Sequence, residues 1–283
     1  MKSIRSTLPP RLVAASFGLA SAGMGAAACN MLLDNGEARF EGGDAGGRDG
    51  GGQGSYCRQQ QPAPALCYDF DDSRPLDAGF TFRAADRSVV QIDSKNSISA
   101  PMALLVELPE GLSEEATAYL ARTIEGPLPT ETRVSFDILL EAASPAGDVE
   151  KPVAKVLDIL ARSPATGPRR SLGVTIGPEL AAIQERIPGG NDGSVAEYPS
   201  IAFPDGAVKP GTWSHIELHL QWRQQTYRAF VGHVKVIDSP MAAAWPSTDT
   251  GVELRLGISY RPKKKTNFTW RFRYDNVVWN VTP

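Results

Sequence analysis

Residues 211–222 read GTWSHIELHLQW, and this stretch decides the fold class. From residue 215 onward, polar and apolar residues alternate one by one. The apolar positions are Ile216, Leu218, Leu220 and Trp222, and the polar positions are His215, Glu217, His219 and Gln221. Successive side chains of a β-strand point to opposite faces of the sheet, so a period of two predicts a strand with one buried face.

The same alternation recurs in four further stretches. Their apolar positions are Val134, Phe136, Ile138 and Leu140; Leu172, Val174 and Ile176; Val252, Leu254, Leu256 and Ile258; and Trp270, Phe272 and Tyr274. Turn-forming runs such as Pro188-Gly189-Gly190 separate them. Many half-buried strands joined by such turns predict an all-β, two-sheet antiparallel sandwich. The alternation also predicts that Glu217, Arg255, Arg271 and Arg273 point away from the core.

Two stretches are ambiguous between helix and strand. Residues 150–162 and 178–186 contain good helix formers, but the first also alternates through Val156, Asp158 and Leu160. We interpret both as strands, since tertiary context decides short runs of this kind.

The first 28 residues predict a secretory signal peptide. Lys2, Arg5 and Arg11 precede a small, apolar run over residues 12–24, and Ala26-Ala27-Ala28 follows. The apolar run is too short for the ~20 residues that span a bilayer as a helix. Cleavage after Ala28 would leave Cys29 as the first residue.

The position of Cys29 resembles that of the cysteine in the bacterial lipobox, which becomes the lipidated N-terminus. Ala26 departs from the leucine that is usual three residues earlier, so cleavage that leaves an unmodified Cys29 remains the alternative. By resemblance to lipoprotein sorting rules, Asn30 indicates the outer membrane. We therefore expect an outer-membrane or cell-surface lipoprotein, the alternative being a periplasmic or secreted protein.

The rest of the chain divides into a tether and one domain. Residues 29–56 are rich in glycine and aspartate and offer almost nothing to bury, which predicts a flexible tether. Residues 57–283 contain no second linker and suffice for one large β-sandwich. The net charge is −3, and removing residues 1–28 with their three basic residues makes it −6. This balance argues against a nucleic-acid partner.

The cysteine count favours one disulfide. If Cys29 carries lipid, Cys57 and Cys67 remain as a pair, and an oxidising compartment allows them to bond. Two free thiols, or a metal-binding pair, are the alternatives.

Four segments resemble the concanavalin A-like (laminin G-like) jelly roll of secreted bacterial lectin and glucanase domains. They are Cys67–Ser73, Ser99–Val106, Gly211–Val236 and Tyr274–Trp279. The resemblance spans residues 67–279 and implies fold more than activity. Glycosidases of that family carry a Glu-x-Asp-x-x-Glu strand, whereas here Ser135 stands in the first Glu position before Asp137 and Glu141. Jelly-roll polysaccharide lyases need a Tyr, His or Lys base with an Arg neutraliser, and no family motif for that set is present.

Two groups of residues are candidate metal ligands. His215, Glu217 and His219 occupy alternate positions of one strand, so they project from one face and could converge on zinc or a similar ion. The alternative is a polar, solvent-facing strand surface. By resemblance to jelly-roll carbohydrate modules, Asp69, Asp71 and Asp275 could hold a structural Ca²⁺ between the first and last strands.

No catalytic motif stands out, and we assign no catalytic residue. All three histidines lie within residues 215–233, and there is no Gly-x-Ser-x-Gly elbow. We therefore expect non-catalytic glycan recognition, with exposed aromatic platforms for sugar rings. The candidate platforms lie in turn-rich, polar stretches and are Tyr198, Tyr227, Trp245 and Tyr260. The alternatives are a structural or protein-interaction domain without a small ligand, and an unrecognised polysaccharide hydrolase or lyase.

Overall fold

The computed structural model describes residues 56–61, 63–71, 75–84, 87–110, 117–142, 153–162, 170–188, 195–197, 200–242, 250–260 and 269–283. All of them belong to one compact unit, Gly51–Pro283. The predicted signal peptide, the lipidation of Cys29 and nearly all of the predicted tether lie outside the described residues.

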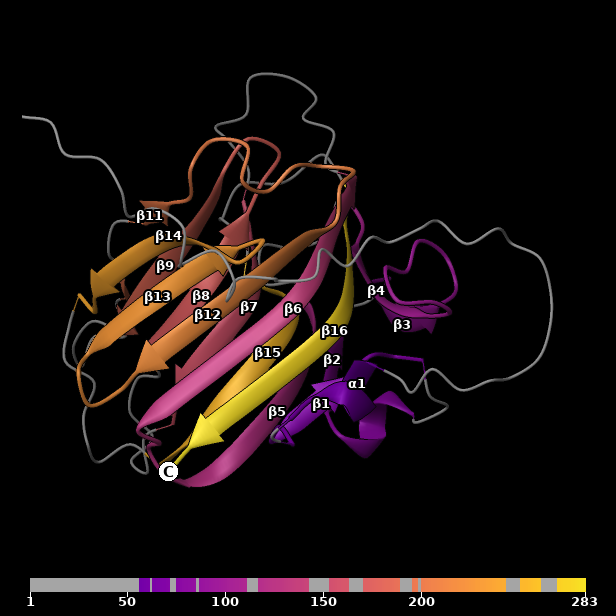
Figure 1. The fold of residues 1–283 in the computed structure, drawn as a ribbon. Coiled ribbons are helices and arrows are strands. Elements are labelled where there is room, and N and C mark those ends of the chain that lie inside the picture. The colour runs from indigo at the N-terminus through magenta and orange to yellow at the C-terminus, as the bar shows by residue number, and fades with distance from the viewer. Residues whose placement is uncertain are drawn as a thin grey trace, which may run out of the picture. The chain divides into compact units, whose positions relative to one another are not determined.

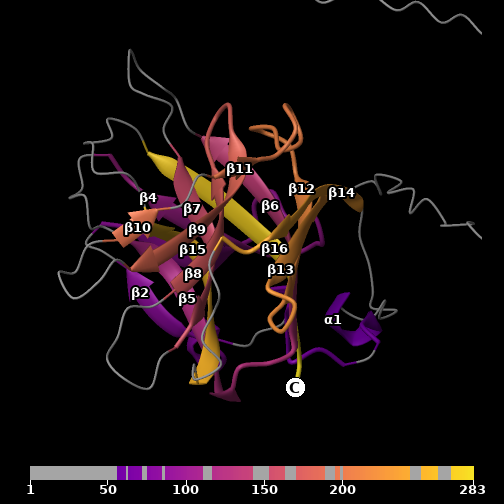
Figure 2. The same cartoon turned by 90° about the vertical axis from the view of Figure 1, so that its left-hand side faces the viewer.

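Two antiparallel sheets form the fold (Figures 1 and 2). In spatial order, sheet A contains β14 (Val234–Pro240), β13 (Thr226–Val231), β12 (Ser214–Gln221), β6 (Glu131–Ala142), β16 (Trp270–Thr282), β4 (Ala103–Leu108) and β3 (Val89–Asp93), and β1 (Leu66–Tyr68) also pairs with β16. Sheet B contains β10 (Val195–Glu197), β9 (Ala181–Pro188), β8 (Arg170–Ile176), β7 (Ala154–Ala161), β15 (Thr250–Tyr260), β5 (Ala118–Pro127) and β2 (Thr81–Ala84), and β11 (Ile201–Ala202) also pairs with β9.

The core lies between the two sheets and consists of the predicted apolar faces. Every apolar residue of the five alternating stretches is at most 2% exposed. At the centre, the hydroxyl of Tyr274 on β16 donates to the carbonyl of Val156 on β7, 3.0 Å away, and so links the two sheets. Trp222 Nε1 donates to Thr132 Oγ1 at 2.8 Å, which satisfies the indole of a buried tryptophan. The predicted two-sheet sandwich is confirmed.

The two ambiguous stretches are strands, as predicted. Residues 154–161 form β7 and residues 181–188 form β9, both inside sheet B. Every residue of β7 is buried, and β8 and β15 pair with it on its two sides. A strand that is buried on both faces contains a near-continuous apolar run. A buried helix contains such a run as well, which is why the sequence alone was ambiguous here.

A β-bulge interrupts the alternation of β16. The pairing with β6 shifts between Asp275 and Val278, and Asn276 has a φ of 49°. Asparagine tolerates this left-handed conformation better than most residues. After the bulge, Val277 and Trp279 return to the core.

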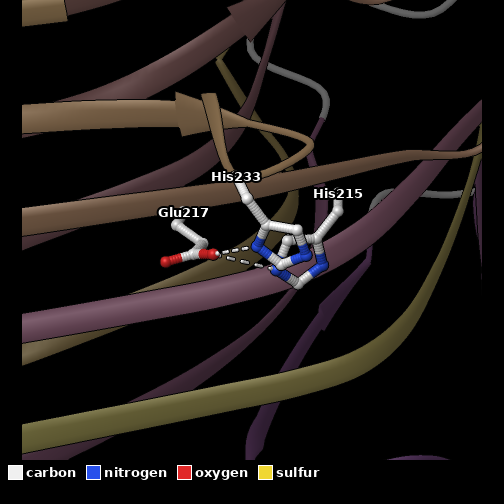
Figure 3. A group of neighbouring side chains, drawn as sticks. All are labelled: His215, Glu217 and His233. Carbon is white, nitrogen blue, oxygen red and sulfur yellow. Dashed lines mark hydrogen bonds and ion pairs between the residues drawn. The ribbon is translucent and has the colours of Figure 1, made fainter. Parts of the chain in front are cut away.

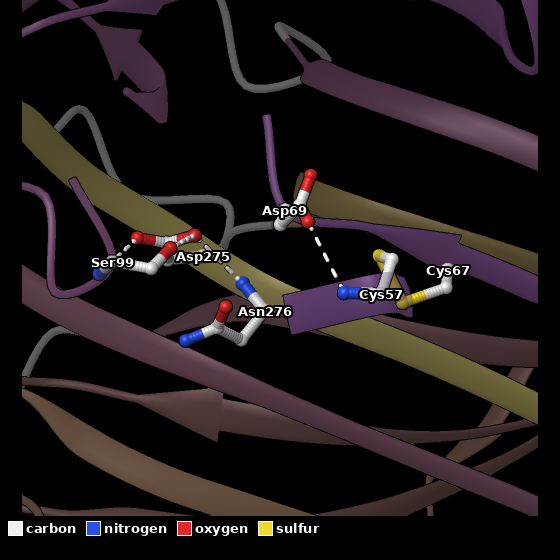
Figure 4. Close-up of a disulfide and its surroundings, with 6 residues drawn as sticks. All are labelled: Cys57, Cys67, Asp69, Ser99, Asp275 and Asn276. Atoms are coloured by element: carbon white, nitrogen blue, oxygen red, sulfur yellow. Dashed lines mark hydrogen bonds between the residues drawn. A yellow bond between two sulfur atoms is a disulfide. The ribbon is translucent and has the colours of Figure 1, made fainter. Parts of the chain in front are cut away.

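The N-terminal part of the unit is fastened to sheet A. Helix α1 (Tyr56–Gln59) lies on the outer side of sheet A, close to β16 (Figure 2). Cys57 in α1 and Cys67 in β1 form a disulfide, as predicted (Figure 4). Cys67 in turn pairs with Val278 of β16. Between β1 and β2 there is one further helical turn, η1 (Leu76–Ala78). Among the described residues, no helix has the length and apolar character needed to cross a membrane.

Candidate functional site

The outer face of sheet A carries the predicted polar positions of β12. Because Ile216, Leu218 and Leu220 point into the core, His215, Glu217 and His219 point outward, and each is partly exposed. The outward residue opposite His215 on β6 is Asp137. The hairpin that joins β13 to β14 adds His233 to the same face.

His215, Glu217 and His233 form a compact cluster on this face (Figure 3). His215 Nε2 lies 3.4 Å from Glu217 Oε1, and His233 Nδ1 lies 3.1 Å from the same oxygen. Each of the three side chains offers one ligand atom, and these atoms all lie within 4.8 Å of one another. Among the described residues, this is the one group of three His, Cys, Asp or Glu side chains with that property.

Hydrogen bonds in this cluster shift the pKa values of its members. Burial alone lowers the pKa of His215, but hydrogen bonds to Asp137 and Glu217, together with their charges, outweigh burial and raise it to about 9. Hydrogen bonds from His215 and His219 are the main cause of a lowered pKa for Glu217. The unliganded cluster therefore holds an imidazolium between two carboxylates near neutral pH.

The predicted set of three metal ligands needs a correction. His219 does not join His215 and Glu217, and His233 takes the third place. His219 Nε2 instead lies 3.3 Å from Glu217 Oε2, the oxygen that faces away from the other two histidines, and its ring packs on Phe230. His215 and His219 flank Glu217 on the strand and start ~13 Å apart, so they meet opposite oxygens of its carboxylate, whereas His233 reaches Oε1 from the hairpin.

Arg273 points outward, as predicted, and yet is buried. Its side chain is only 4% exposed. Its Nη1 donates to Asp93 Oδ1 at 2.6 Å, and its Nε donates to Glu141 Oε1 at 2.6 Å. The carboxylates of Asp93 and Glu141 cover the guanidinium, so a side chain that points outward is not necessarily exposed. Asn96 Nδ2 also donates to Glu141 Oε1, at 2.6 Å.

Trp213 lies between two depressions at this end of the face. The first has a volume of about 500 Å³ and is lined by Asn96, Ser97, Leu139, Glu141, Gly211 and Trp213. The second has a volume of about 360 Å³, and its lining includes Lys209, Thr212, Trp213, His215 and Val231. Trp213 itself is half-buried. Trp213 therefore has the carboxylate of Glu141 and the amide of Asn96 on one side. On its other side it has two cationic groups, which belong to Lys209 and His215.

Asp69, Asp71 and Asp275 do not form a metal-binding group of three, and Figure 4 shows Asp69 and Asp275 with the disulfide. Asp275 is buried and accepts hydrogen bonds from the backbone N–H groups of Ile98, Ser99 and Asn276 and from the Ser99 hydroxyl. Burial raises the pKa of Asp275 to about 7 in spite of these bonds. Asp69 accepts from the Cys57 N–H, and its Oδ1 has no hydrogen-bond partner. Asp71 accepts from the Met102 N–H. The Ca²⁺ assignment stays a prediction.

The four predicted sugar platforms are not supported as a set. Tyr227 is 2% exposed and lies in the core, because it occupies an inward position of β13 next to Ala229. That prediction was wrong, since a polar neighbourhood in sequence does not decide the face of a strand. Tyr198 and Trp245 lie outside the described residues, as does the side chain of Tyr260 at the end of β15.

The outer face of sheet B carries a second polar group. Lys155 of β7 is fully buried there, and its Nζ lies 3.2 Å from Asp158 Oδ1 and 3.2 Å from Ser171 Oγ. It passes over Gly173, where a Cβ would lie 2.9 Å from Lys155 Cδ and 2.4 Å from a backbone oxygen. Opposite Asp158 in the ladder lies Arg255, whose guanidinium is 5.0 Å from the ring centroid of Tyr119.

Comparison with known proteins identifies the fold. No protein-family model matches this chain, and no curated protein matches its sequence. Among solved structures, it is similar to an endo-β-1,4-glucuronan lyase from the fungus Trichoderma reesei, with a TM-score of 0.57 and 13% identity over 77% of this chain and 96% of that one. It is also similar to the cellulose induced protein Cip1, with a TM-score of 0.50 and 12% identity over 77% and 99% of the two chains. These similarities agree with the two-sheet β-sandwich, and at such identities they establish the fold alone.

Proposed function

We propose that this protein is a glycan-recognition β-sandwich that binds sugar rings on Trp213. The observation that carries the proposal is the position of this side chain between two polar depressions on the outer face of sheet A. The apolar C–H faces of sugar rings stack on aromatic rings, while sugar hydroxyls need hydrogen-bond donors and acceptors beside them.

The groups beside Trp213 suit this task. Glu141 already accepts bonds from Asn96 and Arg273 on Oε1, so its side chain is held in place and Oε2 can accept from sugar hydroxyls. Lys209 on the other side can donate to ring or hydroxyl oxygens. Side chains fixed before the ligand arrives lose less entropy on binding.

The cellular setting of the proposal comes from residues 1–29. A signal peptide over residues 1–28 and a lipid on Cys29 would place the sandwich at the outer membrane or cell surface, where polysaccharides are accessible. The tether over residues 29–56 would hold it away from the lipid.

A glycan array followed by calorimetry tests the main proposal. We expect Trp213→Ala to weaken binding by ~10-fold or more, which corresponds to ~1.4 kcal/mol, the size of one aromatic stacking contact. Phe82→Ala is the matched control, because Phe82 is a 48% exposed aromatic residue on sheet B. If the protein binds no polysaccharide but captures a specific protein partner, the structural or protein-interaction alternative replaces this proposal.

A polysaccharide lyase is the second candidate, favoured by the polar row on sheet B. Lyases of uronate-containing polymers need a base for the proton next to the carboxyl group and a cation that neutralises that carboxylate. Lys155, Tyr119 and Arg255 bring these residue types together on one face, although the side chains of Lys155 and Tyr119 are buried and would have to become accessible to act on a substrate. The similar structure that is a glucuronan lyase supports this candidate.

Incubation with glucuronan and other polyuronates tests the second candidate. A lyase leaves an unsaturated uronate at each new chain end, which absorbs in the ultraviolet. Lys155→Met should abolish that signal, whereas Trp213→Ala should leave the maximum rate unchanged. A circular dichroism spectrum identical to wild type would show that the Met variant is folded. An ultraviolet signal that survives in the folded Met variant would remove Lys155 from the mechanism.

A further inference from the structure

The cluster of His215, Glu217 and His233 has the geometry of an incomplete tetrahedron. Four ligands at ~2.0–2.1 Å from a zinc ion lie ~3.3 Å from one another. The two distances to Glu217 Oε1 are 3.4 Å from His215 Nε2 and 3.1 Å from His233 Nδ1. All three atoms lie within 4.8 Å of one another, so small rotations of two imidazole rings bring them onto one ion.

A second contact fixes the orientation of His215. Asp137 Oδ1 lies 2.8 Å from His215 Nδ1, and Asp137 Oδ2 accepts from Asn276 Nδ2 at 2.8 Å. A carboxylate that binds one ring nitrogen of a histidine directs the other nitrogen to a metal, and this arrangement accompanies most metal-binding histidines. Here it directs Nε2 toward Glu217.

The hairpin between β13 and β14 places the third ligand. Gly232 and His233 are its two central residues, with φ angles of 54° and 67°, as in a turn with two left-handed residues. Glycine, asparagine and aspartate are the residues that such turns prefer. Histidine stands there instead, and its ring reaches back over the sheet to Glu217 (Figure 3).

The charges and exposure of the cluster suit a divalent ion. Glu217 and Asp137 together carry two negative charges, which balance the ion when both imidazoles are neutral. The side chain of His233 is 80% exposed, so a water molecule can reach the ion and complete the coordination. His219 holds the other oxygen of Glu217 and thereby orients the carboxylate without occupying a coordination position.

We propose that His215 Nε2, Glu217 Oε1 and His233 Nδ1 bind a divalent transition-metal ion, with zinc the best match. Two imidazoles and one carboxylate are a ligand set that zinc takes with an open fourth position. This proposal is independent of glycan binding.

Calorimetric titration with ZnCl₂ tests the site, on the mature chain without an affinity tag and after treatment with a chelator. We expect one ion per chain. His233→Gly keeps the turn and removes the imidazole, and Glu217→Gln keeps the shape and removes the charge, so each should weaken zinc binding by well over ~10-fold. Asp137→Ala should weaken it by ~10–100-fold through the orientation of His215. His219→Ala is the comparison variant and should weaken binding by ~10-fold, less than the loss of a ligand, because His219 contacts only the other oxygen of Glu217.

Cobalt gives a second measurement that does not depend on heat. Co²⁺ in a tetrahedral site absorbs visible light strongly, and we expect this absorption in the wild type and in His219→Ala but not in His233→Gly. Failure of Zn²⁺ and Co²⁺ to bind at one ion per chain overturns the proposal. So does binding that survives in His233→Gly and disappears in His219→Ala, because that result assigns the site to the three alternate residues of β12.

Discussion

Asp137 on β6 and His215 on β12 are directly opposite each other in the ladder, and Asp137 Oδ1 lies 2.8 Å from His215 Nδ1. This pair links the strand that carries Glu141, beside Trp213, to the strand that carries the metal-binding cluster. The pair therefore places the metal-binding cluster beside the depressions that flank Trp213, although each proposal has its own ligand.

Asp137→Asn should change the pH dependence of stability. The pKa of His215 is raised to about 9 in the folded protein against ~6.5 in the unfolded chain. A raised pKa stabilises the fold below the unfolded value, and this contribution is lost as the pH rises through 9. In metal-free buffer we expect the free energy of unfolding to fall by on the order of 2–3 kcal/mol between pH 6 and 10. Urea titrations should show a clearly smaller fall for Asp137→Asn, and an unchanged slope would contradict the assignment.

Arg273→Ala should destabilise the protein strongly. The substitution leaves Asp93 and Glu141 as poorly hydrated carboxylates without their cation, which costs ~3–5 kcal/mol for a buried pair. Arg133→Ala is the control, because Arg133 is an outward residue of β6 whose side chain is 56% exposed, and its loss should cost less than ~1 kcal/mol. Equal effects of the two substitutions in urea titrations would mean that the Arg273 network contributes nothing.

Loss of the disulfide should cost a moderate amount of stability. Cys57 and Cys67 close a loop with a sequence separation of 10, and the chain-entropy model gives ~2–3 kcal/mol for a loop of this size. The double variant with serine at both positions should unfold at correspondingly lower urea concentration. Cys29→Ala should leave the midpoint unchanged. If Cys29→Ala lowers it as much, the pairing involves the wrong cysteine.

Asp275→Asn should reduce the pH dependence of the free energy of unfolding between pH ~4 and 7. Burial, the larger effect, raises the pKa of Asp275 to about 7, and bonds from Ser99 only partly offset it. The stability from the protonated form is therefore present below pH ~4 and is lost as the pH rises through 7.

Added Ca²⁺ offers a separate test of Asp69, Asp71 and Asp275. An ion bound there should raise the wild-type midpoint at pH 8 and leave the variant unchanged.

Cys29→Ala should release the protein from membranes. If Cys29 is lipidated, wild-type protein partitions with the membrane fraction and the variant with the soluble fraction. Fractionation followed by mass spectrometry of the N-terminal peptide measures both. A wild-type protein that is soluble and begins with an unmodified Cys29 would contradict the anchor.

Sequence patterns predicted the fold well because alternation decides it directly. Phe272 is buried and Arg271 is not, as their parity in β16 requires. The ambiguous residues 154–161 form a strand because β8 and β15 pair with them along both edges. Parity predicts the direction of a side chain and not what other strands place over it, so it predicts that Arg273 points outward but not that Asp93 and Glu141 cover it. Tyr227 was placed on the surface because its sequence neighbourhood is polar, although its parity with Ala229 indicates the core.

The candidate site was predicted only in part, for a related reason. His215 and Glu217 follow from the period of β12, but His233 joins them through the pairing of β12 with β13, which sequence spacing alone does not give. The Gly232-His233 turn was the available signal, because a two-residue hairpin after β13 returns its tip to the start of β12. Trp213 was noted as the start of a strand and not as a surface aromatic, since its place beside Asn96 depends on a loop far away in sequence.

The disulfide also decides how mechanical load would pass through the protein. A pull on the chain ahead of Tyr56 enters at Cys57, crosses to Cys67 and bypasses the residues between them. From Cys67 the load passes into β1 and then, along the strand direction, into β16, which pairs with both β6 and β4. Hydrogen bonds loaded along their strands must break together and not one at a time. Tension on the N-terminal segment would therefore be carried by the three-residue pairing of β1 with β16 before it reaches the rest of sheet A.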